Sequence, residues 1–322
     1  MSLPALIGDI GGTNARLALV YPGEVTPHDI INLPCADYPG VVEAVQDYLN
    51  RVGAVGQNAP QEACLAFACP VHAERVKMTN NHWDFLKSDV QQALNLSLFK
   101  VINDFTAQAL GVPHVAAKDL VEVQPGTSQA HATRLIIGPG TGLGVAGVFP
   151  GQHAWIPLPT EGGHITFAPT DDTERAIVDI FKQHHARVSV ERVLCGQGLL
   201  ELYQAHCTLA GIAPQLNHPA DVTDAAKQGD ELAIAALLRF LKILGDVCGD
   251  ATLTMGARGG VYLCGGIVPR LLDWLPNSEL CSAFTNKGRM NIYNADIPIW
   301  VVTAPWTGLL GAAEALHNEE VY

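Results

Sequence analysis

The stretch "ALIGDIGGTNARLALVYPG" (residues 5–23) decides the fold: an apolar run, a glycine-rich turn carrying Asp9, a second apolar run and a Pro-Gly stop. This pattern predicts a strand over 5–7, a tight turn and a second strand over 16–21. The same features return in "RLIIGPGTGLGVAGVFPG" (residues 134–151). A repeat of this kind predicts two related α/β halves, each presenting one glycine turn.

The remaining periodicity predicts alternating helices and strands around these hairpins. Apolar residues at helical spacing predict a helix near 41–52, and "DFLKSDVQQAL" (84–94) predicts another. The segment 99–112 predicts a strand and then a helix, with Asn103 and Asp104 at the junction. Residues 172–256 are expected to be mostly helical. Further elements are expected at "ACLAFACPV" (63–71, strand), "GGVYLCGG" (259–266, strand), "IPIWVV" (297–302, strand) and "GLLGAAEALH" (308–317, helix).

Composition excludes several classes of protein. The 322 residues are 48% hydrophobic and 16% charged, which is typical of a globular protein. The net charge of −13 and the lack of a basic run argue against nucleic-acid binding. We expect no membrane span, because no apolar stretch reaches the required ~20 residues. We also expect no signal peptide, because "MSLPALIGDIGG" lacks a basic flank and a long apolar core. Eight scattered cysteines without a C-x-x-C pair predict reduced thiols and a cytoplasmic location.

Three phosphate-binding patterns compete for the glycine turns. A P-loop is excluded, because no lysine follows the glycines at the required spacing. Gly142, Gly144 and Gly147 match the dinucleotide-binding string G-x-G-x-x-G, but the chain continues as a strand to Pro150 instead of beginning a helix. The third possibility is a pair of hairpins whose turn amides bind a polyphosphate.

The carboxylate inside the first turn favours this third possibility. Asp9 would repel a bare phosphate, but a Mg²⁺ ion on the phosphates reverses that preference, so Asp9 is the expected magnesium ligand, through water. Thr13 and Thr141 can add hydroxyl donors. The alternative is that both segments are ordinary hairpin turns, and the embedded aspartate with the matched repeat makes the phosphate interpretation the better one.

At these residues the chain resembles the actin-like ATPase superfamily of sugar kinases, and within it the bacterial glucokinases. The similar stretches span nearly the whole chain: "GDIGGTNARLAL", "ACPV…MTNNHW", "VINDFTA", "GPGTGLGVA", "LPTEGGHITFAP", "VSVERVLCGQGL" and "GGIVPR". The related repressor–kinase (ROK) group often carries a cysteine-rich zinc motif after its G-G-H. The segment after His164 has no such cysteine, which favours the zinc-free branch and argues against a zinc role for His164.

The resemblance implies a phosphotransferase that uses ATP and Mg²⁺ to phosphorylate glucose at its 6-hydroxyl, the first step of glycolysis. It implies two actin-like (ribonuclease H-like) α/β domains flanking a sugar/ATP cleft, with residues 1–108 and 301–322 forming a small α/β domain and 109–300 a large α+β domain. It also implies a homodimer. Glucose and ATP are the expected small-molecule partners.

The resemblance also implies roles for individual residues. Asp104 is the implied general base. The implied sugar-binding residues are Asn80, Asn103, Asp104, Glu161, His164 and Glu191. The implied nucleotide-binding residues are Gly8, Asp9, Gly11, Gly12, Thr13 and Asn14 in the first hairpin, Gly138, Gly140, Thr141 and Gly142 in the second, and Gly265 and Gly266 near the adenosine.

Simpler interpretations of three of these residues stay open at this stage. Asp104 could cap the helix that begins near Phe105. His164 could be a buried imidazole, and Glu191 could be an ordinary acid in the first turn of a helix whose N-cap region includes Ser189. For the whole chain, the alternatives are a kinase for another hexose and a non-catalytic sugar sensor. Repressor relatives place a DNA-binding helix-turn-helix before the first strand, and a strand that starts near Ala5 leaves no room for one.

Overall fold

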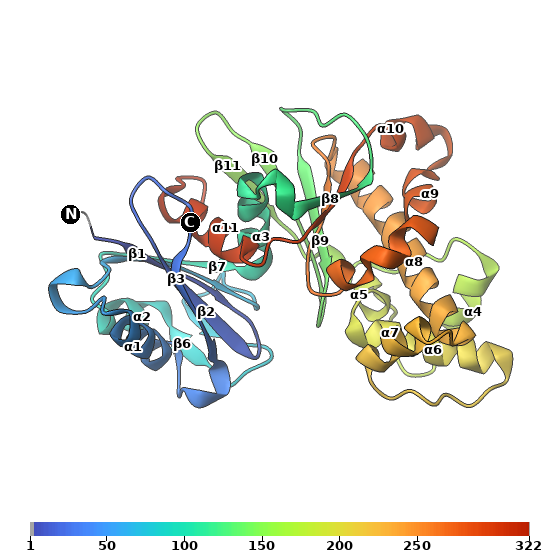
Figure 1. Cartoon of the computed structure of the whole chain (residues 1–322), viewed down its shortest axis with the longest axis horizontal. Coiled ribbons are helices and arrows are strands. Elements are labelled where there is room, and N and C mark those ends of the chain that lie inside the picture. The colour runs from blue at the N-terminus through green and yellow to red at the C-terminus, as the bar shows by residue number, and fades with distance from the viewer. Residues whose placement is uncertain (1–2, 322) are drawn as a thin grey trace. The chain divides into compact units, whose positions relative to one another are not determined.

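The computed structural model describes residues 3–321 and divides into two compact units (Figure 1). Unit 1 consists of Met1–Asp119, Val148–Pro159 and Ala304–Tyr322, of which Met1, Ser2 and Tyr322 lie outside the described residues. Unit 2 consists of Leu120–Gly147 and Thr160–Thr303. The chain therefore passes between the units several times.

The sheet of unit 1 contains five strands in the order β3-β2-β1-β4-β7. Strand β1 pairs antiparallel with β2 and parallel with β4, and β4 pairs parallel with β7. The carboxyl ends of β1, β4 and β7 therefore meet at one edge of the sheet, where ligands of α/β proteins bind. The strands are β1 (Ala5–Ile10), β2 (Asn14–Val20), β3 (His28–Pro34), β4 (Glu62–Phe67) and β7 (Leu98–Asn103).

The second sheet repeats this arrangement, in the order β11-β10-β9-β12-β13-β8. Its first five strands follow the same order by chain position as those of the first sheet, and β12 pairs parallel with both β9 and β13. The repeated halves predicted from the two hairpins are thus confirmed. The strands are β8 (Leu120–Gln124), β9 (Arg134–Pro139), β10 (Leu143–Pro150), β11 (Trp155–Pro159), β12 (Val261–Leu263) and β13 (Ile299–Val302).

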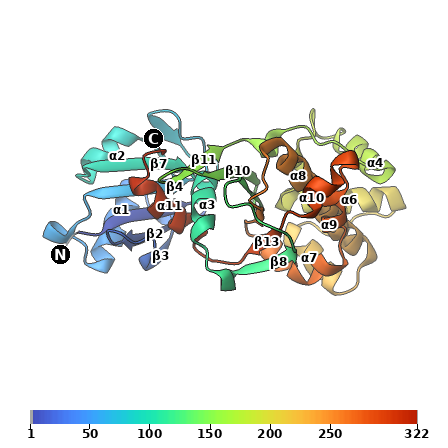
Figure 2. The same cartoon turned by 90° about the horizontal axis from the view of Figure 1, so that it is seen from above.

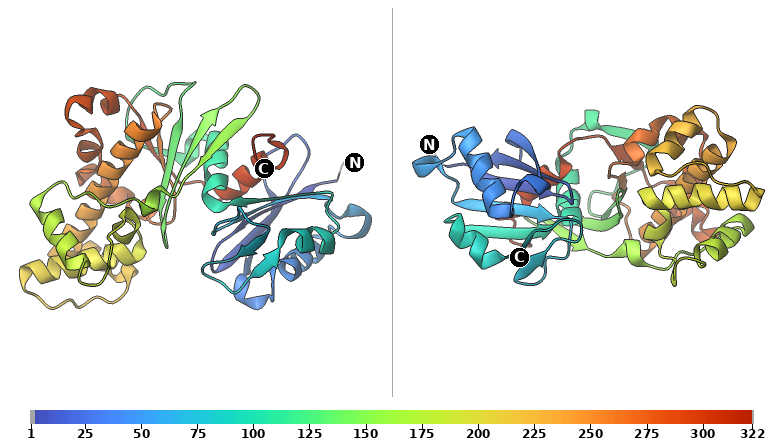
Figure 3. Two further views of the ribbon diagram at one scale, coloured as in Figure 1. Left: turned by 180° about the vertical axis from the view of Figure 1, so that it is seen from behind. Right: turned by 90° about the horizontal axis from the view of Figure 1, so that it is seen from below.

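Helices cover both faces of the sheet in unit 1 (Figure 3). The helices are α1 (Val41–Val52), α2 (Lys87–Ala93), α3 (Asp104–Gly111) and α11 (Thr307–His317). Val45 and Tyr48 of α1 share a buried core with Leu6 and Ile10 of β1. Because side chains alternate across a strand, Ile7 and Asp9 of β1 point to the opposite face, which α11 covers.

Unit 2 adds a helical layer to the strands of the second sheet that it contains. Its helices are α4 (Asp172–Phe181), α5 (Val190–Val193), α6 (Gly196–Ala210), α7 (Pro219–Lys227), α8 (Glu231–Met255), α9 (Leu280–Thr285) and α10 (Asn291–Ala295). The long helix α8 packs against α6, α7 and α9 (Figure 2). The helical character expected for residues 172–256 is confirmed. Within residues 3–321, no helix is both long enough and apolar enough to cross a membrane.

One secondary-structure prediction is wrong at its beginning. The helix expected over 84–94 starts only at Lys87, because Asp84–Leu86 form strand β6, which pairs antiparallel with β5 (Arg75–Lys77). A two-bond ion pair between Arg75 and Asp84 links the two strands at 2.7 and 3.0 Å. A pairing partner nine residues earlier in the chain is not visible in a local periodicity.

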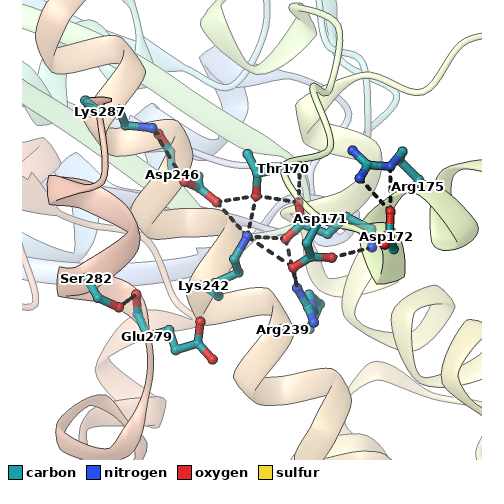
Figure 4. Close-up of polar contacts among 11 residues, drawn as sticks. Thr170, Asp171, Asp172, Arg175, Arg239, Lys242, Asp246, Glu279, Ser282 and Lys287 are labelled. Atoms are coloured by element: carbon teal, nitrogen blue, oxygen red, sulfur yellow. Dashed lines mark hydrogen bonds and ion pairs between the residues drawn. The ribbon is translucent and has the colours of Figure 1, made fainter. Parts of the chain in front are cut away.

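A network of buried charges ties α4 to α8 in unit 2 (Figure 4). The side chain of Glu174 is 1% exposed, and its Oε1 lies 3.1 Å from Arg239 and 2.7 Å from Lys242. Its other oxygen accepts hydrogen bonds from the backbone and hydroxyl of Thr170. Lys242 also pairs with Asp246, which in turn contacts Lys287. Each buried charge therefore has a partner, as such charges require.

We expect Glu174→Gln to destabilise the protein by about 2 kcal/mol, because it removes the buried carboxylate that Arg239 and Lys242 share and leaves them only their other partners, Asp171 and Asp246. Asp172→Asn is the matched control in the same helix turn. Its carboxylate is 97% exposed and, among residues 3–321, is paired with Arg175 alone, so the expected loss is below about 1 kcal/mol. Urea unfolding of both variants measures the difference. Equal losses would contradict the role given to the network.

Candidate active site

The first hairpin turn, Gly11–Thr13, joins β1 to β2 in unit 1. Gly11 N donates to Asn14 O at 2.9 Å and closes the turn. A Cβ at Gly12 would lie 2.8 Å from Asn80 Cβ, so glycine allows the Asn80 segment to approach the turn. Gly8 lies inside β1 instead of in the turn, where a Cβ would meet Leu65 Cδ2 at 2.7 Å.

Two residues that were not expected from the sequence, Cys35 and Asn81, donate hydrogen bonds to the carbonyl oxygens of this turn. Cys35 N donates to Thr13 O at 2.8 Å, and Cys35 Sγ donates to Gly11 O at 3.7 Å. Asn81 Nδ2 donates to Gly11 O at 3.4 Å, while its own Oδ1 accepts from the Trp83 backbone. The position of Asn81 beside Asn80 in "MTNNHW" was a usable signal. Nothing local in the sequence connects Cys35 with the turn.

Asp9 lies near the end of β1, opposite Arg16 of β2. Arg16 Nη1 donates to Asp9 Oδ2 at 3.3 Å. The carboxylate also packs against the first turn of α11, where a Cβ at Gly308 would lie 2.8 Å from Asp9 Oδ2. Burial raises the pKa of Asp9, and the Arg16 guanidinium opposes that effect. Neither Arg16 nor Gly308 was expected from the sequence.

Asp104 follows β7 and is the first residue of α3. The helix cap is Asn103, whose Oδ1 accepts from Phe105 N at 2.9 Å and Thr106 N at 3.3 Å. The interpretation of Asp104 as the cap is therefore wrong, although its Oδ1 also accepts from Phe105 N at 2.9 Å. Burial, and then the charge of Asp9, raise the pKa of Asp104 to about 7.

The pair of carboxylates fits a magnesium–nucleotide complex. Both pKa values are raised because negative charge at these positions is poorly solvated, and a cation would relieve that cost. Among residues 3–321, no group of three or more histidine, cysteine or acidic side chains could hold a metal by itself. Mg²⁺ needs no such cage, since it commonly binds through one or two carboxylates, water and substrate phosphates.

The second hairpin turn, Gly140–Gly142, joins β9 to β10. Gly140 N donates to Gly142 O at 2.8 Å, and Gly196 N at the start of α6 donates to Gly140 O at 2.9 Å. Gly138 lies in β9, before the turn. Gly265 follows β12 with a φ of +78°, and a Cβ there would lie 2.6 Å from Pro139 O, so Gly265 lies against the same hairpin. Gly266 is next to it and has open space around it.

Glu161, His164 and Glu191 come together in unit 2. His164 Nδ1 lies 3.7 Å from Glu191 Oε1, and His164 Nε2 lies 3.9 Å from Glu161 Oε2. His164 is 59% exposed, so the interpretation of a buried imidazole is wrong. Glu191 does lie in the first turn of α5, after the N-cap Ser189. Its Oε2, however, accepts from the backbone of the second hairpin, at Leu143 N, at 2.9 Å.

The structure thus places the expected residues in two groups. The Asp104 group of unit 1 combines two carboxylates and three amide side chains with the first glycine turn: Asp9, Gly11, Gly12, Thr13, Asn14, Asn80, Asn103 and Asp104. The Glu191 group of unit 2 combines acids and an imidazole with the second turn: Gly140, Thr141, Gly142, Glu161, His164 and Glu191. Both groups offer backbone amides beside side chains that can accept hydrogen bonds from hydroxyls.

The chain is similar to known proteins over nearly its whole length. The Glucokinase family model matches residues 6–319. A glucokinase of Chromohalobacter salexigens is 65% identical over 321 residues, covering all of both chains. A crystal structure of glucokinase from an Antarctic psychrotroph is 34% identical, covers 99% of this chain and 100% of that one, and has a TM-score of 0.90.

A more distant solved structure shares the fold. A ROK family glucokinase from Streptomyces griseus, in complex with glucose and AMPPNP, is 19% identical and has a TM-score of 0.63. The alignment covers 97% of this chain and 99% of that one. The actin-like fold class expected from the sequence is therefore confirmed.

The raised pKa of Asp104 makes stability depend on pH. Its neutral form is favoured in the folded protein up to about pH 7, against 3.8 for an ordinary aspartate. The stability that this contributes is fully present below about pH 3.8 and is lost as pH rises through 7. Asp104→Asn stays neutral, so we expect it to raise Tm relative to the parent more at pH 8 than at pH 5.

Asp84→Asn is the control for this titration: Arg75 lowers the pKa of Asp84, so this carboxylate is ionised at both pH values and the variant should change Tm by the same amount at pH 5 and pH 8. Differential scanning fluorimetry at both pH values measures the change in Tm. A Tm difference for Asp104→Asn that is the same at pH 5 and pH 8 would contradict the titration.

Proposed function

The chain belongs to the glucokinase family, and from this premise we propose how its own residues carry out the reaction. The protein is a glucose kinase that uses ATP as phosphoryl donor. We infer that the acceptor is the 6-hydroxyl of glucose. Phosphoryl transfer depends mainly on positioning and charge stabilisation, and the attacking alcohol must also lose a proton.

We propose that Asp104 accepts that proton. The observation that carries this assignment is its position at the carboxyl end of β7, at the same sheet edge as Asp9, where burial raises its pKa to about 7 and lets the carboxylate both hold and release a proton near neutral pH. Asn103 supports the arrangement from the neighbouring position. Because its Oδ1 caps α3, only its Nδ2 group is left to donate to a sugar oxygen, and that group also contacts Cys69 O at 3.4 Å.

Sugar selection is proposed for the Glu191 group. Glu161, His164 and Glu191 supply carboxylate and imidazole partners for several hydroxyls, and such a site rejects analogues that lack one of them. Asn80 is a further proposed sugar ligand, and its contact with Gly12 supports a position beside the first turn. Discrimination between glucose and other hexoses belongs to this proposal. A panel of hexoses in a coupled ADP assay tests it.

The two glycine turns are proposed to bind the ATP phosphates through backbone amides, with Thr13 and Thr141 adding hydroxyl donors. Gly8 and Gly138, inside the flanking strands, belong to the same proposal, and Gly265 and Gly266 are proposed to lie near the adenosine. Asp9 would hold Mg²⁺, through water, which when bound neutralises charge on the phosphates. The homodimer and the cytoplasmic, glycolytic role stay predictions, and sedimentation analysis tests the first.

We expect Asp104→Asn to lower kcat by about 10²–10⁴-fold while glucose affinity is largely kept, since the amide preserves shape but cannot accept the proton. In the parent enzyme, kcat/KM for glucose should rise with pH and level off above about 7, as Asp104 of the glucose-free enzyme ionises. Steady-state kinetics at saturating MgATP and calorimetry with glucose measure these effects. A near-normal kcat for the variant would remove Asp104 from the base role.

A further inference from the structure

The second glycine turn is held by the same segments that carry the proposed sugar-binding residues. Glu191 Oε2 accepts the hydrogen bond from Leu143 N, the first residue after the turn. Gly163, between Glu161 and His164, packs so closely that a Cβ there would lie 2.3 Å from Leu143 O. The end of the turn is therefore in contact with both segments.

Gly142 is the point where the turn and the carboxylate meet. A Cβ at Gly142 would lie 2.6 Å from Glu191 Oε2 and 3.4 Å from its Cδ. Gly140, two residues earlier in the same turn, has no atom within 4 Å of such a Cβ. Neither glycine has a positive φ. An alanine at either position therefore tests space and not backbone strain.

We propose that Glu191 is a positioning residue for the second glycine turn in addition to a sugar ligand, and that Gly142 is glycine so that one carboxylate can do both. One oxygen holds the turn through Leu143 N, and the other, which faces His164, is left for a sugar hydroxyl. This inference rests on the proposed function, in which Glu191 binds the sugar and the second glycine turn binds the nucleotide. Its consequence is that a methyl group added to the nucleotide turn weakens glucose binding.

The first experiment compares Gly142→Ala with Gly140→Ala by calorimetric titration of glucose without nucleotide. We expect the glucose Kd to rise at least about ten-fold in Gly142→Ala. The added methyl group displaces the Glu191 carboxylate, and the hydrogen bond between this charged group and the sugar hydroxyl is lost. It should stay within about two-fold in Gly140→Ala, which has room for the methyl group. Equal changes in the two variants would overturn the proposal. Thermal melting of both proteins checks that they are folded.

The second experiment asks whether the effect passes through the carboxylate. In a Glu191→Ala background the space beside residue 142 is vacant, so Gly142→Ala should no longer change the glucose Kd. A ten-fold effect that persists in this background would overturn the proposal. At saturating glucose, Glu191→Ala should also raise KM for ATP at least about three-fold, because the turn loses its support.

Two outcomes in Glu191→Ala distinguish a failure of the proposed function from a failure of the positioning role. An unchanged glucose affinity in Glu191→Ala would remove Glu191 from the sugar ligands and so contradict the proposed function. An unchanged KM for ATP in the same variant, together with lost glucose affinity, would keep the sugar role and overturn the positioning role.

Discussion

The candidate active site of unit 1 is built around two carboxylates that the fold holds largely out of water. Asp9 near the end of β1 and Asp104 after β7 stand on either side of β4, at the edge where the three parallel strands end. Removing a carboxylate from water costs free energy unless a charge or hydrogen bonds compensate. Arg16 compensates Asp9 in part, and the pKa of both groups stays raised. Two carboxylates with raised pKa values at one sheet edge are suited to binding a cation and to accepting a proton.

The second half of the molecule keeps the frame of the first and changes its chemistry. The two sheets share one strand order, but Gly138 stands in β9 at the position that Asp9 has in β1, one residue before the end of the strand. No carboxylate therefore comes from within the second hairpin. Glu191 brings one from α5 instead and places it against the turn. A repeated fold thus supports two different sites: one suited to a cation and a proton, the other to neutral hydroxyl groups.

The sequence predicts the parts of this structure that depend on local patterns. The glycine turns, the strand before Asn103 and the helices of residues 172–256 follow from periodicity and turn residues, and the structure confirms them. It does not predict interactions between distant segments. Strand β6 depends on pairing with β5, and choosing Asn103 over Asp104 as the cap depends on side-chain orientation. Cys35 supports a turn more than twenty residues away, which no spacing rule reveals.

Both turns share one physical arrangement that their sequences do not display. A carbonyl oxygen aimed at a phosphate would repel it, so the proposed phosphate role favours turns whose carbonyls are bonded elsewhere. In the first turn, Gly11 O accepts from Cys35 and Asn81, and Thr13 O accepts from Cys35.

In the second turn, Gly140 O accepts from Gly196 N and Gly142 O from Gly140 N. A thiol and an amide side chain in one half thus do what the first amide of a helix does in the other. Because donors of different chemistry meet the same requirement, it is the engagement of the carbonyls, and not the identity of the donor, that the two halves have in common.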